Sequence, residues 1–162
     1  MVIVEIDSNY INAKPTKNKT GKEHINAYQE LLCYIKLSRA CNLKLHTQNN
    51  KASKEFQDEI NKQCKMQMVP LDTHRWNIVK KTIKTFKNHY IVILAGVDLQ
   101  CPISLWCKLI PSQAVLTLNL VQLSNVYPNI LAYAFMHGHF NYNTMDIRPL
   151  GCAIQLYLKH HQ

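Results

Sequence analysis

The chain has 162 residues, of which 47% are hydrophobic and 18% are charged. This composition is typical of a globular protein and excludes collagen-like or low-complexity chains, and the length is enough to bury a core without disulfides or a structural metal. Lysine and arginine number 19 against 10 acidic residues, a net charge of +9, which favours polyanionic partners, nucleic acid before anionic membranes.

The positive charge is concentrated in the first part of the chain. Residues 1–89 hold 16 basic and 8 acidic side chains, whereas residues 90–162 hold 3 and 2. Between Asp98 and Asp146 the only charged side chain is Lys108. We therefore expect the first part to face a polyanion and the second part to be largely buried.

The first predicted elements are two paired strands. Residues 1–6 are mostly apolar and β-branched, as in a buried strand. Residues 7–9, Asp-Ser-Asn, are typical of a turn. Residues 10–14 then alternate between the two faces, which predicts a hairpin.

Helices and short strands alternate over the next fifty residues. Thr20 and Glu23 have the spacing of a capping box, which predicts a helix from there to about Arg39. Short strands are predicted at 43–47 and 66–69, with a second helix between them. The apolar residues on the inner faces of the two helices are Ile25, Tyr28, Leu31, Leu32, Ile35, Phe56, Ile60 and Cys64.

A long helix is predicted from about Asn77 to Leu94, with a strongly basic outer face. Its outward lysines are Lys80, Lys81, Lys84 and Lys87, and Arg75 comes just before it. No acidic residue lies between Asp72 and Asp98. The inward residues at helical spacing are Ile78, Ile83, Phe86, Tyr90 and Ile93.

The rest of the chain is predicted to form a helical tail. Residues 103–123 predict one helix bent at Pro111, or two helices. Residues 128–136 predict a further short helix, and 153–158 a terminal strand. The element order predicts an α/β fold. We expect one domain over residues 1–142, and the start of a C-terminal β segment or tail over 143–162.

The cysteines and the apolar runs suggest an intracellular protein. Six cysteines show no paired C-x-x-C spacing, so we expect reduced, mostly buried thiols rather than a zinc or redox motif. The first residues lack the basic region of a signal peptide. The longest apolar run, 90–97, is far shorter than the ~20 residues of a spanning helix. We therefore expect no membrane association.

Several ordered stretches make the chain resemble the catalytic core of retroelement integrases, of the retrotransposon and retroviral type. The resemblance covers almost the whole chain. It is carried by IDSNYINAKP at 6–15, KTGKEH at 19–24, HRWN at 74–77, IKTFKNH at 83–89, LTLNL at 116–120, AYA at 132–134 and HFNYN at 139–143. It implies a ribonuclease-H-like mixed sheet with helices, lacking its first strand and followed by a helical tail.

The resemblance also implies that integrase chemistry is absent. Family members hold two Mg²⁺ or Mn²⁺ ions with three carboxylates, the hard oxygen ligands these metals prefer. The first would lie on a strand before residue 1. The second position matches Gln48, which is neutral, and the third matches Lys80, whose charge repels a metal. We therefore expect no catalysis and no cofactor.

The function that the resemblance leaves is non-specific DNA binding. The family helix that matches residues 77–94 lies along DNA, so Arg75, Lys81, Lys84 and Lys87 are the expected contacts. Contacts of this type go to phosphates and weaken steeply with salt. If the family role persists, the protein acts in the nucleus. The alternative for these lysines is a merely solvated helix face.

The apolar helices over 103–136 predict a second kind of function, a homo-oligomer or interaction module. A third hypothesis is an unselected genomic remnant of a polyprotein. His137 and His139 have the spacing of a metal-binding pair but lack a neighbouring third ligand. Without the first strand of the family, residues 1–6 either close directly against residues 43–47 or leave a gap in the sheet.

Overall fold

The computed structural model describes residues 1–38, 44–47, 54–63, 65–68, 78–99, 101–145 and 147. Within them the fold is mixed α/β, as the element order predicts. The strands are β1 (Val2–Glu5), β2 (Tyr10–Ala13), β3 (Lys44–Thr47) and β4 (Lys65–Met68). The helices are α1 (Gly21–Ser38), α2 (Lys54–Gln63), α3 (Ile78–Ala95), the 3-10 turn η2 (Ile103–Leu105), α4 (Trp106–Leu109), the π-helical segment η3 (Ile110–Val115), α5 (Leu116–Asn119) and α6 (Ala132–His137).

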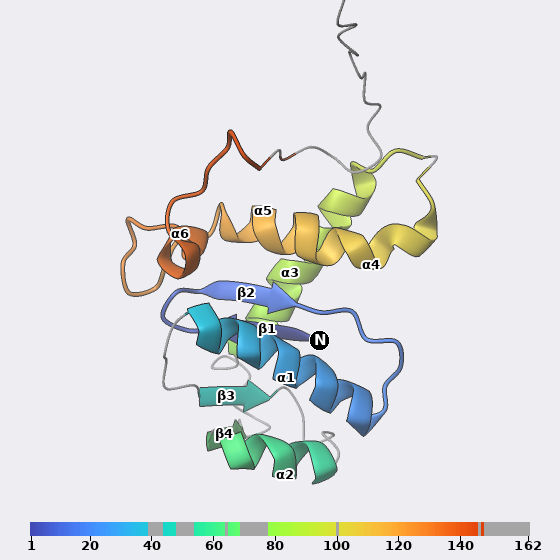
Figure 1. The fold of residues 1–162 in the computed structure, drawn as a ribbon, viewed down its shortest axis with the longest axis vertical. Coiled ribbons are helices and arrows are strands. Elements are labelled where there is room, and N and C mark those ends of the chain that lie inside the picture. Colours follow the sequence, from blue (N-terminus) through green and yellow to red (C-terminus); the bar gives the residue numbers. More distant parts are fainter. Residues whose placement is uncertain are drawn as a thin grey trace, which may run out of the picture.

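The strands form two separate pairs in the described part of the chain. β1 and β2 are antiparallel, with Val4 opposite Ile11, whereas β3 and β4 are parallel. Helix α1 lies across one side of the strands and α3 passes behind them, while α4 to α5 run along β2 and α2 lies next to β4 (Figure 1). Among the described strands, β1 pairs with β2 and not with β3, so direct closure of β1 onto β3 is not seen there.

The hairpin follows closely from its sequence. Asn9 adopts a positive φ of 58°, which asparagine tolerates better than most residues. The buried Glu5 carboxylate accepts hydrogen bonds from the amides of Asp7 at 3.2 Å and Ser8 at 2.6 Å. The amide of Tyr10 donates to Ser8 Oγ at 3.0 Å. These bonds close the loop, so the predicted strand–turn–strand is confirmed.

Helix α1 begins at the predicted residue, but its cap differs from a capping box. Thr20 Oγ1 accepts from the amide of Glu23 at 3.4 Å, as expected. The Glu23 carboxylate, however, accepts from the amide of Lys17 at 3.2 Å, and Asn18 Oδ1 takes the amide of Thr20. The inner face of α1 is confirmed, since Tyr28, Leu31, Leu32 and Ile35 are all buried.

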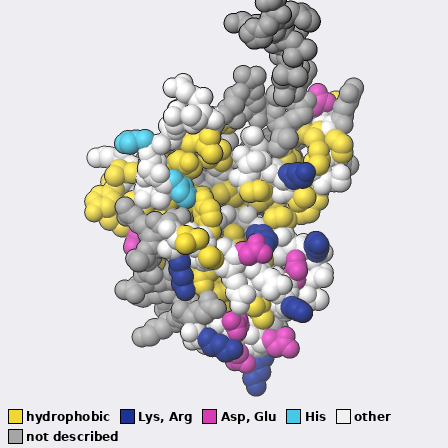
Figure 2. All heavy atoms as spheres, in the orientation of Figure 1, with side chains coloured by type: hydrophobic (Ala, Val, Ile, Leu, Met, Phe, Trp, Pro, Cys, Tyr) yellow, Lys and Arg dark blue, Asp and Glu magenta, His cyan; other side chains and the backbone are white. Residues whose placement is uncertain are grey.

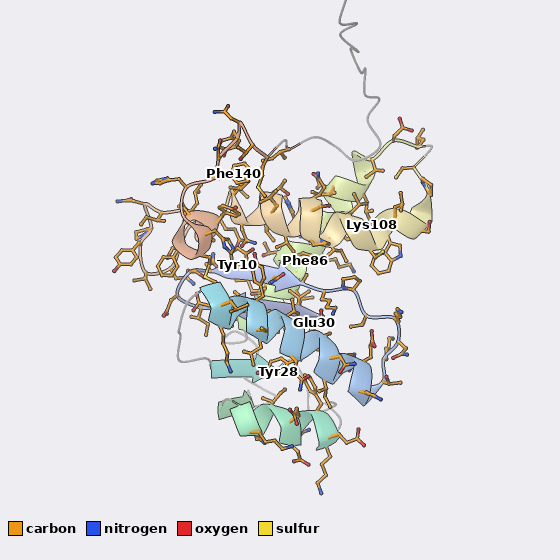
Figure 3. All side chains as sticks on the ribbon, viewed as in Figure 1. Tyr10, Tyr28, Glu30, Phe86, Lys108 and Phe140 are labelled. Atoms are coloured by element: carbon orange, nitrogen blue, oxygen red, sulfur yellow. The ribbon has the colours of Figure 1, made fainter. Side chains whose placement is uncertain are left out.

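The buried residues fall into two clusters, and both include residues from the inner face of α1. The larger joins the hairpin, α3 and the helices after it, and contains Ile11, Ile35 and Phe86. The smaller joins α1 to α2 through Tyr28, Leu32 and Ile60. Phe86 and Tyr28, labelled in Figure 3, mark the two clusters.

Residues 103–119 form one continuous helical path through Pro111. Proline has no N–H to donate to the residue four positions earlier, and the helix widens there into the π-helical segment η3. The one-helix alternative is therefore correct, but the helix ends at Asn119 instead of residue 123.

The last described helix begins later than predicted, at Ala132 rather than 128. Leu123 and Leu131 form an isolated antiparallel bridge. The amide of Ala132 donates to the carbonyl of Gln122 at 2.8 Å, and that of Ile130 to Tyr127 at 2.9 Å. These bonds hold the preceding residues in a tight loop, which delays the helix. The strand predicted at 153–158 lies outside the described residues.

The expectation of mostly buried thiols is wrong for Cys33, which is exposed. It follows Leu32 on α1 and is turned away from the buried face. Cys101 and Cys107 are partly exposed free thiols.

Candidate functional site

The outer face of α3 carries the lysines singled out by the sequence. Thr82 and Phe86 are the buried residues of this helix and hold its inner face against the core. The side chains of Lys81, Lys84 and Lys87 are all exposed on the outer side of the helix. Lys80, in the first turn, is half-buried. Because Lys80, Lys84 and Lys87 are spaced four and three residues apart, they share one stripe of the helix.

The exposed lysines at 81, 84 and 87 have no acidic partner in the part of the chain that the structure describes. Ion pairs found there join Lys14 to Glu30 and Lys62 to Glu59, at 3.1 Å in the second case. Helix α3 has no acid in its first turn, and no carboxylate on its length. The face is therefore a concentrated positive surface with these three charges available to a ligand.

Two of the residues tied to the expected site lie outside the described residues: Arg75 and Gln48. Among the predicted contacts, the structure brings together Lys81, Lys84 and Lys87 on one helix. Lys80, which the resemblance to integrases aligns with a metal-binding carboxylate, lies in the first turn of the same helix.

Within the described ranges, the side chains offer no site that fits a divalent metal. Lys80 is cationic, and no group of three or more His, Cys, Asp or Glu side chains that could hold a metal occurs among the described residues. His137 Nε2 lies 3.1 Å from Tyr34 Oη, so that one histidine of the predicted pair is engaged by a phenol.

A chain of polar groups runs from the hairpin to α6. Tyr10 Oη lies 3.3 Å from Tyr34 Oη, which in turn contacts His137. Burial raises the pKa of the Tyr10 phenol and lowers the pKa of His137. Both groups are therefore neutral at pH 7. Tyr10 and Tyr34 border a hollow of about 750 Å³ between β2, α1 and η3, which Lys14 and Tyr133 also line.

A second hollow lies at the C-terminal end of α3, and the sequence did not reveal it. Its volume is about 410 Å³. Its walls come from α3 and from the segment that follows, and they include Tyr90, Leu94, Pro102, Trp106 and Leu109. The available signal was Trp106, a large aromatic residue within an apolar stretch, which the structure leaves 41% exposed.

Figure 2 shows that side-chain types are separated on the visible face. Apolar side chains gather over α4 to α6, whereas lysines and acids gather over α1 and α2. The acids of α2 are paired or solvated: Glu59 accepts from Gln29 at 3.2 Å, and Asp58 is exposed. Together with their described neighbours they form no group of three or more acidic, histidine or cysteine side chains that could hold a metal.

Comparison of the chain with protein-family models, with curated proteins and with solved structures found no significant match. No helix in the described ranges is both long enough and apolar enough to cross a membrane.

Proposed function

We propose that the chain is an integrase-like α/β domain without catalytic activity, which binds DNA non-specifically through Arg75, Lys81, Lys84 and Lys87. The observation that carries the proposal is the exposed lysine face of α3. Three flexible ammonium groups on one rigid helix can follow a line of phosphates, and phosphate contacts confer affinity without base specificity. In this function the protein acts on nuclear DNA.

The order and pairing of the strands support a ribonuclease-H-like origin. The chain forms an antiparallel pair, then helix α1, then a parallel pair connected through α2. This is the order expected of a ribonuclease-H-like sheet without its first strand. Loss of activity follows from charge, because Lys80 and Gln48 supply no anionic oxygen for a metal.

Charge reversal on α3 tests the proposal. DNA binding is measured by fluorescence anisotropy with a mixed-sequence duplex, and the triple variant Lys81→Glu, Lys84→Glu, Lys87→Glu should lose binding at physiological salt. The matched control is Lys17→Glu, Lys19→Glu, Lys22→Glu, which changes the net charge equally at exposed positions before and at the start of α1. Equal losses in the two variants, or unchanged binding in the first, would contradict the proposal.

The second candidate is a homo-oligomer formed through the helices over 103–136. The observation that favours it is a group of exposed apolar side chains in this region: Trp106, Val121, Leu123, Val126, Tyr127 and Ile130. Exposed apolar groups of this extent mark interaction surfaces in soluble proteins. Sedimentation velocity over a concentration series should then show a reversible dimer, and a monomer at all concentrations would exclude this candidate.

A genomic remnant with no selected role is the third candidate. Such a chain is expected to unfold without a cooperative transition, because its core has not been maintained. Urea unfolding followed by far-UV circular dichroism separates it from the other two candidates.

A further inference from the structure

The hollow beside Trp106 continues the lysine stripe of α3. Lys80, Lys84, Lys87, Ile91 and Leu94 follow one another at spacings of four, three, four and three residues, so they lie along one line of the helix. The first three are basic, and the last lines the hollow. Lys87 precedes Leu94 by seven residues, about 10 Å along the helix axis. A charged surface thus leads directly into an apolar hollow.

The hollow is held in shape by a contact to the core. Tyr90 Oη donates a hydrogen bond to the carbonyl oxygen of Trp106 at 2.9 Å. The Tyr90 ring stacks on the buried Phe86, with centroids 6.1 Å apart and planes 7° apart. Burial raises the pKa of the Tyr90 phenol, so it remains protonated as the donor. The wall that carries Trp106 is therefore fixed before any ligand arrives.

The ligand that suits both parts is a single nucleic-acid strand. A polyanion satisfies the lysines, and an aromatic, uncharged group suits a hollow lined by Trp106, Leu94 and Pro102. In a duplex, both faces of a base are stacked on neighbouring bases and its Watson–Crick edge is paired, so only an unpaired base presents a free face.

We propose that the hollow accepts one unpaired nucleobase, stacked on Trp106, of a DNA strand whose phosphates lie along Lys84 and Lys87. The inference rests on the proposed DNA binding and deepens it, since it assigns a preference for single-stranded or frayed DNA over blunt duplex. Stacking is tolerant of base identity, so no strong sequence preference accompanies it.

The test compares an oligo(dA) strand with a blunt duplex of the same length, using Trp106→Ala. The variant should weaken oligo(dA) binding by about 5- to 150-fold for the stacked base and leave duplex binding nearly unchanged. Trp106→Phe keeps an aromatic face and should retain most of the affinity. Both variants keep Trp76 and all the lysines.

A second measurement does not depend on how the variants fold. The wild-type protein should bind an abasic strand, with the same phosphates but no bases, as weakly as Trp106→Ala binds oligo(dA). Equal binding of the abasic and oligo(dA) strands would overturn the inference. So would a Trp106→Ala variant that changes the sedimentation of the protein but not its DNA binding, since the hollow would then hold another protein. If the α3 triple variant still loses DNA binding in that case, only the base-stacking inference fails and the DNA-binding proposal stands.

Discussion

Asn119 closes the free edge of the hairpin by pairing with Ile11. Its Oδ1 accepts from the Ile11 amide at 2.8 Å, and its Nδ2 donates to the Ile11 carbonyl at 2.7 Å and to the Val115 carbonyl at 2.7 Å. One amide side chain thus gives β2 the two bonds that a neighbouring strand would supply. Asn119 is fully buried, and it fastens α5 to the sheet.

Replacing Asn119 by leucine should destabilise the protein strongly. The side chains are similar in size, but the Ile11 amide and carbonyl would be left buried without partners, at a cost of about 1–3 kcal/mol for each group. Urea unfolding measures the change. The control is Asn143→Leu at an exposed position, which should shift the midpoint little. Equal midpoints for the two variants would show that the Asn119 bonds contribute nothing to stability.

Removing one lysine of α3 should reduce the salt dependence of DNA binding. If Lys84 contacts a phosphate, Lys84→Gln should make the plot of log affinity against log salt shallower by about 0.9 in slope, because one fewer counterion is released. Titrations at several salt concentrations give the slope. Lys36→Gln, exposed on α1, is the matched control and should leave it unchanged. A slope unaffected by Lys84→Gln would remove this residue from the interface.

Stability should fall as the pH is lowered, in part because of His89. Burial lowers the pKa of His89 from its ordinary value of 6.5, and its Nε2 lies 2.7 Å from Thr117 Oγ1. The unfolded chain therefore takes up the proton first, so the free energy of unfolding decreases as pH falls from about 6.5 towards the lower folded pKa. His89→Gln should flatten this decrease in urea midpoints measured between about pH 7.5 and about pH 5. An unchanged pH profile would contradict the role of His89.

Divalent metals should have no effect on this protein. If the proposed integrase-like assignment holds, Lys80 lies where a metal-binding carboxylate would be needed, so we expect no cutting or joining of a supercoiled plasmid in Mg²⁺ or Mn²⁺. A chelator should leave both DNA binding and the unfolding midpoint unchanged. Strand cutting that disappears on chelation would show that the assignment as an inactive domain is wrong.

Local sequence signals predicted most helices and strands, whereas contacts between residues far apart in the sequence could not be predicted. The turn at residues 7–9 and the inner face of α1 depend on neighbouring residues, so their patterns were sufficient. The Asn119–Ile11 pairing joins residues 108 positions apart, and no local pattern indicates it. The late start of α6 has the same cause, since it depends on the bridge between Leu123 and Leu131.

The candidate site divides in the same way. The lysine stripe lies within one helix, and its spacing alone placed Lys84 and Lys87 on one face. The hollow beside Trp106 depends on how the chain folds back onto the end of α3, where Tyr90 meets the Trp106 carbonyl. Neither residue signals this contact by its position in the sequence.

The two separate core clusters imply that the protein does not open as a single unit. Helix α2 is joined to α1 by the small cluster around Ile60, whereas β1, β2 and α5 share the larger one. Regions with few buried contacts open at lower free energy than the rest of a domain. Amide hydrogens of α2 should therefore exchange with solvent through a partial opening that leaves the hairpin protected, and a brief exposure to protease should cut α2 first.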